Sequence, residues 1–273
     1  MPPNAGQFFT PRSRKWRMST TFHLTFHRSK RQSMWYRCCS HIPVSTASSH
    51  TTTIESSAAI SRTCVRHAGI GPISIDPQVQ DQGIGRKLME AAIDRLASTN
   101  VCGIRLVQSA YNNRSLALYT RLGFQTRESL SVIQGPALNI KFAGYDVRPA
   151  GAADIAACNH LCRQVHGFER GAELREAISA HTARVVEHLG RITGYATDLG
   201  FFAHAVAETN QDLKSLIAAA PAFQGPGFLL PTRNHEVFAW CLESGLKLVM
   251  QMTLMSIGFY NEPRGAWLPS ILL

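Results

Sequence analysis

A short apolar strand, a proline turn and a glycine-flanked helix start follow one another near the middle of the first half. Residues 70–75 read as the strand, Pro77 forces the turn, and Gly83 and Gly85 stand where the helix begins. Glycines at this place let the backbone approach a ligand closely. The first helical turn offers unpaired N–H groups and the positive end of the helix dipole, and Arg86 adds charge beside it. The segment is typical of a site that binds phosphate or pyrophosphate.

The glycine spacing narrows the class of phosphate site. A Walker A loop needs the pattern GxxxxGK[ST], which this segment lacks. A dinucleotide fingerprint, GxGxxG, needs a third glycine near Leu88, and that position holds leucine. Both of these nucleotide-binding loops are therefore excluded here.

Helices and strands alternate after the glycine turn. Apolar residues recur at helical spacing between Gly85 and about Ala97, which predicts an amphipathic helix. Residues 103–107 read as a buried strand. Asn112 or Asn113 can cap a second helix that ends at Gly123, and a further strand opens at the next residue. The order strand, helix, strand, helix, strand predicts an α/β layer.

Two blocks of this segment resemble the GCN5-related N-acetyltransferase (GNAT) family. Gln80, Gly83 and Gly85 match its Q-x-x-G-x-G signature. Residues 112–124 look like its N-x-x-[SA]-x-x-L-Y-x-x-x-G-F segment, at the expected distance downstream. The resemblance implies an α/β fold with a mixed sheet of the α+β kind, and acetyl-CoA as co-substrate, with no metal.

The resemblance also implies a role for each matching residue. In the family, backbone amides of the first block hold the pyrophosphate of coenzyme A; here that block contains Gln80, Gln82, Gly83, Ile84, Gly85 and Arg86. The matching asparagine contacts the pantetheine arm, which points to Asn112. The matching tyrosine protonates the departing thiolate, which makes Tyr119 the catalytic candidate. From the residues alone, a plain helix cap at Asn112 and a core aromatic at Tyr119 remain alternatives.

Acetyl transfer to an amine makes further demands on the site. The thioester carbonyl must be polarised, and one backbone N–H at a splayed strand edge, at Ser74 or Ile75, can do this. A tyrosine hydroxyl near the sulfur can act as the general acid. The amine must lose a proton, but Glu55 is the only acid before residue 69, and Asp76 precedes a proline as turn residues do. Either a chain of water molecules takes the amine proton, or the first domain is incomplete and inactive.

The second half also resembles the family. Residues 145–155 look like the opening strand of such a domain, with an R-P-A-x-x-x-D-I pattern. No Q-x-x-G-x-G loop follows; residues 190–210 stand where it belongs. We therefore expect tandem GNAT-like domains, with the first incomplete at its N-terminus and the second degenerate. The expected division is a poorly ordered basic region at 1–68, the acetyl-CoA-binding segment at 69–141, and the second domain at 145–273.

The positive charge is concentrated at the N-terminus. The chain carries a net charge of +10, and residues 1–54 hold eight Lys and Arg and no acid. The remainder is nearly balanced, which argues against a nucleic-acid partner for the body of the chain. An Arg- and Ser-rich, acid-poor head is typical of a mitochondrial transit peptide. A disordered extension or an unnatural start from a faulty gene model is the alternative.

Cysteine usage and hydropathy bear on the compartment. The seven cysteines form no CxxC pair, which favours reduced intracellular thiols and a cytoplasmic location over a disulfide framework. No apolar run reaches the roughly 18 residues of a membrane span, so no membrane partner is expected.

The sequence thus predicts an N-acetyltransferase that uses acetyl-CoA to modify a primary amine, on a small molecule or a protein. The alternative is a non-catalytic, regulatory acyl-CoA-binding protein that kept the cofactor loop and lost the acceptor half. A homodimer is possible, although a second domain can take the place of a dimer partner.

Overall fold

The computed structural model describes residues 67–71, 73, 75, 82–99 and 101–272. The chain divides into two compact units, 1–47 and 48–273, and all described residues belong to the second. The elements of that unit are β1 (His67–Gly69), α2 (Ile84–Ala97), β2 (Gly103–Ser109), α3 (Asn113–Arg121), β3 (Gln125–Gln134), β4 (Tyr145–Pro149), the 3₁₀ turn η2 (Ala152–Asp154), α4 (Ile155–His166), α5 (Gly171–Ser179), β5 (Arg184–His188), β6 (Arg191–Ala196), β7 (Ala205–Ala207), α6 (Asn210–Ala218), β8 (Phe228–Pro231), α7 (His235–Glu243), β9 (Lys247–Gly258) and β10 (Ala266–Leu268).

Two five-stranded sheets organise these elements. Sheet A has the strand order β1-β2-β9-β3-β8, and sheet B has the order β10-β7-β6-β5-β4. In sheet A the pair β1·β2 is parallel, whereas β2·β9, β3·β9 and β3·β8 are antiparallel. The expectation of an α/β fold with a mixed sheet is confirmed.

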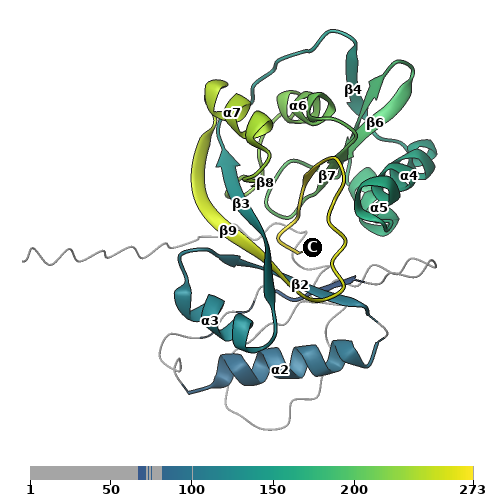
Figure 1. Ribbon diagram of the computed structural model, residues 1–273. Helices are drawn as coiled ribbons and strands as arrows, with labels where there is room; N and C mark the ends of the chain where they lie inside the picture. The colour runs from purple at the N-terminus through teal and green to yellow at the C-terminus, as the bar shows by residue number, and fades with distance from the viewer. Residues whose placement is uncertain (1–66, 72, 74, 76–81, 100, 273) are drawn as a thin grey trace, which may run out of the picture. The chain divides into compact units, whose positions relative to one another are not determined.

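Strand β9, from the end of the chain, lies in the centre of sheet A. It pairs with β2 over 103–109 on one side and with β3 on the other, so β3 does not contact β2 in the ladder. Strand β3 in turn pairs with β8. Figure 1 shows β9 and β3 running alongside each other. Both halves of the chain therefore contribute strands to one sheet.

The same succession of elements occurs twice in the chain, and strands from the two copies pair with each other in sheet A, an arrangement that we call the strand exchange. The order β1-α2-β2-α3-β3 is repeated as β7-α6-β8-α7-β9. In each copy an asparagine side chain caps the second helix, accepting from a backbone N–H at 3.1 Å for Asn112 and 3.4 Å for Asn234. Eleven positions later each helix ends at a left-handed glycine, with φ of +94° at Gly123 and +89° at Gly245. Each copy sends its last strand into the middle of sheet A.

Helix α2 covers one face of sheet A through the predicted apolar stripe. Met89, Ala92 and Leu96 are buried against Ile104 and Leu106 of β2. The helix predicted over residues 85–97 and the strand predicted over 103–107 are thus confirmed. Helices α4 and α5 belong to another core cluster, which also contains residues of β3, β9 and sheet B.

The local residue pattern of the sequence misplaced or missed several elements. The strand expected at residues 70–75 is His67–Gly69 instead, although the N–H of Ile70 still donates to the carbonyl of Arg105 at 2.8 Å. No element was predicted for the stretches that form α5, β9 and β10. Burial along β9 does not alternate, because its central residues are enclosed on both faces, so the two-residue period of a strand is lost.

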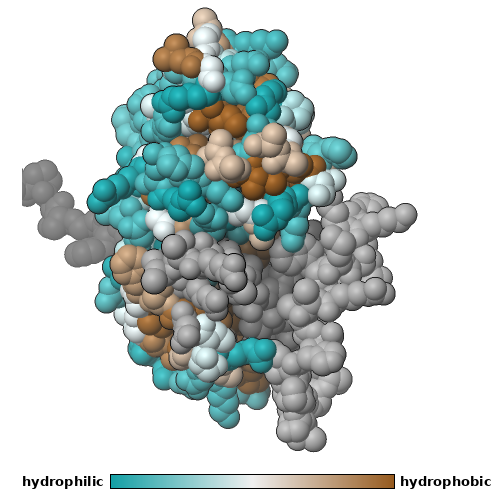
Figure 2. Space-filling model, turned by 90° about the vertical axis from the view of Figure 1, so that its right-hand side faces the viewer, coloured by the Kyte–Doolittle hydropathy of each residue, from teal (hydrophilic) through white to brown (hydrophobic). Residues whose placement is uncertain are grey.

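The surface shows no long apolar stretch on the face seen in Figure 2, where small apolar patches lie among polar side chains. Scattered exposed apolar residues of this kind are ordinary for a folded chain. Within the described residues, no helix combines the length and apolarity needed to cross a membrane.

Candidate functional site

Among the described residues, no side chain caps the first-turn N–H groups at the start of α2. Gly83 is the residue before the helix, with a left-handed φ of +75°, and it makes no capping bond. The first turn contains no acidic residue. An anion placed here would meet the backbone N–H groups of the first turn and the positive end of the helix dipole; that a phosphate binds here stays a prediction.

Gly85 lies at a close approach of backbone and side chain. A Cβ atom at this position would lie 2.8 Å from Cδ1 of Ile75 and 3.8 Å from Cδ2 of Leu118. Glycine therefore lets α2 start directly against the segment that follows β1 and against α3. The segment after β1, the start of α2 and helix α3 therefore meet at Gly85.

The remaining residues of the predicted pyrophosphate site are only partly described. Ser74 and Gln80 lie outside the described residues, as does the rest of the turn at 76–81. Gln82 is exposed, and Ile75 and Ile84 are half-buried. Arg86 is exposed and its guanidinium lies 3.8 Å from the carboxylate of Glu90, one helical turn on, a surface pair that contributes little stability. The Arg86 side chain is therefore available to an anion at the helix start.

Asn112 caps α3. Its side-chain oxygen accepts a hydrogen bond from the backbone N–H of Ser115 at 3.1 Å, so the capping alternative is confirmed. The side chain is exposed at the end of β2, and its contact with a pantetheine arm stays a prediction.

Tyr119 lies on the inner face of α3, half-buried against Phe124 with ring centroids 6.1 Å apart. Burial raises the pKa of the Tyr119 phenol, and a hydrogen bond with Ser115 acts weakly in the opposite direction. The phenol therefore keeps its proton at neutral pH, as a general acid must.

Gln108 was not identified from the sequence. It is 5% exposed, on the same face of β2 as Ile104 and Leu106, and its side-chain nitrogen and oxygen have no partner among the described residues. A buried amide usually finds partners, so an unsatisfied one suits a ligand that carries amides of its own. The only sequence signal is the position of Gln108, two residues after Leu106 and so on the apolar face of the strand.

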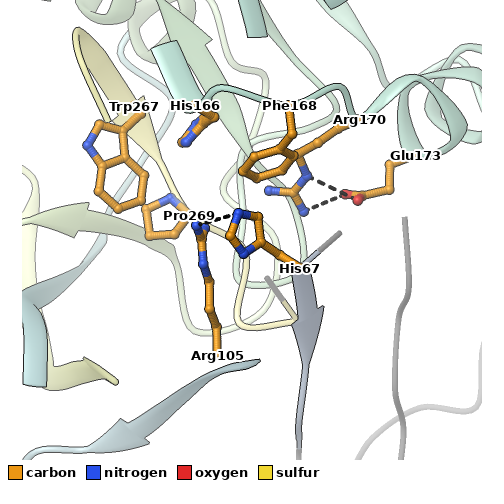
Figure 3. A pocket seen from close by; sticks show the side chains of 8 residues that line it. All are labelled: His67, Arg105, His166, Phe168, Arg170, Glu173, Trp267 and Pro269. Atoms are coloured by element: carbon orange, nitrogen blue, oxygen red, sulfur yellow. Dashed lines mark hydrogen bonds and ion pairs between the residues drawn. The ribbon is translucent and has the colours of Figure 1, made fainter. Parts of the chain in front are cut away.

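The opposite face of the β1–β2 pair holds a second group of unpredicted residues. A cavity of about 20 Å³ is lined by aromatic, basic and acidic side chains, shown in Figure 3 and contributed by His67, Arg105, His166, Phe168, Arg170, Glu173, Trp267 and Pro269. Arg105 lies within the strand that the sequence marked as buried, which was the one available signal.

The second copy of the repeat has a different helix start. Only Glu208 and Thr209 separate β7 from α6. The Asp212 carboxylate accepts hydrogen bonds from the backbone N–H of Thr209 at 3.1 Å and from the hydroxyls of Thr209 and Thr193, both at 2.5 Å. Gly194, in the stretch where a loop was expected, lies within β6. The start of α6 therefore already holds a carboxylate, which repels a phosphate.

The second copy also lacks the tyrosine. Cys241 stands seven positions after Asn234, as Tyr119 stands seven positions after Asn112. It is fully buried, and burial raises the pKa of its thiol to about 12. This thiol neither ionises nor reaches a ligand near neutral pH.

Comparison with known proteins agrees with the geometry of the first copy. Residues 26–124 match the model of the Acetyltransferase (GNAT) family. The mycothiol acetyltransferase of Kocuria rhizophila is 40% identical over 53 residues, which is 19% of this chain and 18% of that protein. The [ribosomal protein bS18]-alanine N-acetyltransferase of Escherichia coli K12 is 39% identical over 66 residues, 24% of this chain and 45% of that protein. This chain thus spans less than half the length of either relative.

A solved structure shares the fold over a larger part of the chain. A candidate acetyltransferase from Pyrococcus horikoshii superimposes with a TM-score of 0.58 at 16% identity, covering 73% of this chain and 70% of that one. The structural match shows a shared fold, and the family match covers the stretch that contains α2 and α3. By sequence, residues 26–124 are therefore similar to the acetyltransferase (GNAT) family.

Proposed function

We propose that this protein is an N-acetyltransferase that transfers the acetyl group of acetyl-CoA to a primary amine. The observation that carries the proposal is the uncapped start of α2, with left-handed Gly83 and close-packed Gly85, beside the helix that presents Tyr119. An anion-binding helix start and a protonated phenol on the neighbouring helix suit a ligand with a pyrophosphate at one end and a thioester at the other.

The proposed roles follow the chemistry of the reaction. The pyrophosphate binds the N–H groups from Gly83 to Arg86, and the pantetheine amides contact Asn112 and Gln108. The neutral amine attacks the thioester carbonyl carbon, and a backbone N–H at Ser74 or Ile75 stabilises the oxyanion. The carbon–sulfur bond then breaks, the sulfur takes the proton of Tyr119, and the amine proton passes to water, which re-protonates the phenolate in the next step.

We further propose that the second half is a degenerate counterpart of the first. It repeats the capped helix and the left-handed glycine, but Asp212 fills the start of α6 and Cys241 replaces the tyrosine. Two related halves, 69–141 and 145–273, then leave one acetyl-CoA site per chain, so no second copy is needed to complete it.

The acceptor is proposed to be a small-molecule amine or a protein amino group, in the cytoplasm. Both relatives named above are acetyltransferases by name, one a mycothiol acetyltransferase and one an N-acetyltransferase of an alanine in ribosomal protein bS18. A primary amine is the feature that an N-acetyltransferase requires of its acceptor, and both classes supply one.

The test is amine-dependent release of the coenzyme A thiol. The full chain is incubated with acetyl-CoA and a panel of amino acids, polyamines and peptides with free N-termini, and the free thiol is measured. Release that requires both an amine and Tyr119 is the expected result. The regulatory alternative predicts that acetyl-CoA binds but that no amine accelerates thiol release, and this outcome would overturn the catalytic proposal.

A further inference from the structure

The cavity behind β1 and β2 gathers charged side chains from both halves of the chain. His67 stands on β1 and Arg105 on β2, while Arg170 and Glu173 come from the start of α5 (Figure 3). Arg105 faces away from α2, because its strand neighbours Ile104 and Leu106 face that helix. The cavity therefore lies on the side of the β1–β2 pair opposite the proposed coenzyme site.

Arg105 is a buried cation without a carboxylate partner among the described residues. It is 6% exposed, and one guanidinium nitrogen lies 3.4 Å from Nε2 of His67. The guanidinium carbon lies 5.0 Å from the ring of Tyr260 and 5.4 Å from that of Phe168. Its Nε has no hydrogen-bond partner in the part of the chain that the structure describes. Burial lowers the pKa of Arg105 to about 10, so it remains positively charged at neutral pH.

The acid that lines the cavity, Glu173, is already paired. Glu173 accepts two hydrogen bonds from Arg170, at 3.0 Å from Nε and 2.6 Å from Nη2, and also lies 3.2 Å from Nδ1 of His204. Burial alone would raise the pKa of Glu173, but Arg170 and His204 lower it overall. The carboxylate is therefore ionised and balances the charge of Arg170, not that of Arg105.

The two histidines of the cavity are neutral. Burial, reinforced by Arg105, lowers the pKa of His67 to about 3, and burial together with Arg170 lowers that of His166 well below its usual value. Nδ1 of each ring has no partner among the described residues. Because the charges of Arg170 and Glu173 balance, the cluster has one net positive charge, on Arg105. The Nδ1 atoms of the two histidine rings can still form hydrogen bonds.

From this charge and geometry we infer that the cavity is a binding site for a carboxylate group, held by Arg105 with His67 and His166. An unpaired buried charge is costly, and an anion supplies the missing partner. One net positive charge matches a monoanion, whereas a phosphate dianion would leave charge uncompensated. A guanidinium binds the two oxygens of a carboxylate with parallel hydrogen bonds, and the apolar walls of Phe168, Trp267 and Pro269 exclude water.

Two sources of this carboxylate have the same chemistry, a free small anion and the acceptor amine itself. The second source rests on the proposed function. Because the cavity is lined by His67 of β1, and the segment after β1 contains the Ser74 and Ile75 proposed to hold the thioester, an acceptor that carries a carboxylate, such as an amino acid, can be oriented by it. The experiments below separate the two sources.

The site is tested by thermal unfolding of the full chain at constant ionic strength, with chloride replaced stepwise by acetate. A ligand that binds only the folded state raises the melting temperature with its concentration. We expect a rise for the wild type, a smaller one for Arg105→Lys, and none for Arg105→Met. Arg127→Met is the control, since Arg127 also contacts Tyr260, at 5.3 Å, but does not line the cavity. Equal shifts in all four proteins, or none in the wild type, would overturn the inference.

A measurement on the wild type alone covers the case in which a variant fails to fold. Transfer of saturation from the protein to the methyl protons of acetate detects binding directly, and formate in excess should displace the acetate. Absence of transfer from a folded chain contradicts the site. Acetyl-CoA binding is measured on the same sample, so failure of the coenzyme site and failure of the carboxylate site are told apart.

The source is then decided by comparing amino acids with their amides as acceptors. If the acceptor supplies the carboxylate, kcat/KM falls at least tenfold for the amide, and Arg105→Met removes that preference. If a free anion occupies the cavity, acid and amide are acetylated equally while acetate still raises the melting temperature. Both results require the site, and they assign its occupant.

Discussion

Tyr119 combines a partly buried hydroxyl with a ring that packs on Phe124, so its two contributions can be separated. Tyr119→Phe keeps the ring and removes the proton donor. We expect kcat to fall by about 10²-fold, the lower range for loss of a general acid, with acetyl-CoA affinity unchanged. Steady-state thiol release gives kcat, and Tyr111→Phe is the matched control because Tyr111 is 79% exposed. An unchanged kcat would show that another group protonates the thiolate.

Three buried histidines make the folded chain sensitive to acid. The pKa values of His67, His166 and His204 are all lowered, mainly by burial. Below pH about 6.5 the unfolded chain binds protons that the folded chain does not, so stability falls as pH falls. For His67, whose pKa in the folded chain is about 3, the loss approaches about 1.4 kcal/mol per pH unit. Urea unfolding at pH 7.5, 6.5 and 5.5 measures it.

The contribution of one histidine to that slope is isolated by substitution. His67→Asn should reduce the pH dependence of the unfolding free energy between pH 6.5 and 5.5, since the pKa of His67 is about 3 in the folded chain. His160→Asn, at an exposed position, should leave the slope unchanged. The same slope in both variants would mean that His67 is protonated in the folded state.

At the scale of elements, the two capped helices provide an internal control for ligand binding. Asn112 and Asn234 make the same capping bond at the starts of α3 and α7. Replacing either by alanine should cost about 1 kcal/mol of stability. Only Asn112→Ala should also weaken acetyl-CoA binding, because Asn234 heads the copy whose helix start is filled by Asp212. Equal acetyl-CoA affinity in the two variants would mean that Asn112 only caps α3 and does not contact the coenzyme.

The elements differ in how far the sequence determines them. Helix α2, its apolar stripe and the caps of α3 follow from residues within one or two turns, and the glycine-flanked helix start was predicted on that basis. Strand β9 could not be placed, because its position between β2 and β3 depends on residues more than a hundred positions away. The repeated asparagine and glycine, eleven positions apart, were present in the sequence but gain meaning only beside the matching strands.

The candidate site divides in the same way. Gly83, Gly85, Asn112 and Tyr119 belong to two local blocks, which a pattern can identify. The cavity around Arg105 is assembled from β1, β2, the α4–α5 connection and the end of the chain, so no local spacing indicates it. Gln108 was missed for a related reason, since its lack of partners is visible only in three dimensions.

For the whole molecule, the strand exchange predicts that the two halves hold together without a covalent link. Residues 135–144 connect β3 to β4 without helix or strand. A protease site placed there, once cut, should leave both pieces in one peak on gel filtration, because β9 remains paired with β2 and β3. When the cleaved protein is unfolded in urea, the two pieces should separate on gel filtration. Separation under native conditions would contradict the exchanged topology.

Calorimetric titration of the full chain with acetyl-CoA tests the central claim, that the start of α2 is a coenzyme A site. Gly83→Asp places a carboxylate at that helix start, and Ala91→Asp adds the same charge at an exposed position further along α2. The account predicts micromolar binding by the wild type and by Ala91→Asp, and at least a tenfold loss for Gly83→Asp. Equal binding by all three proteins, or none by a folded wild type, would contradict it.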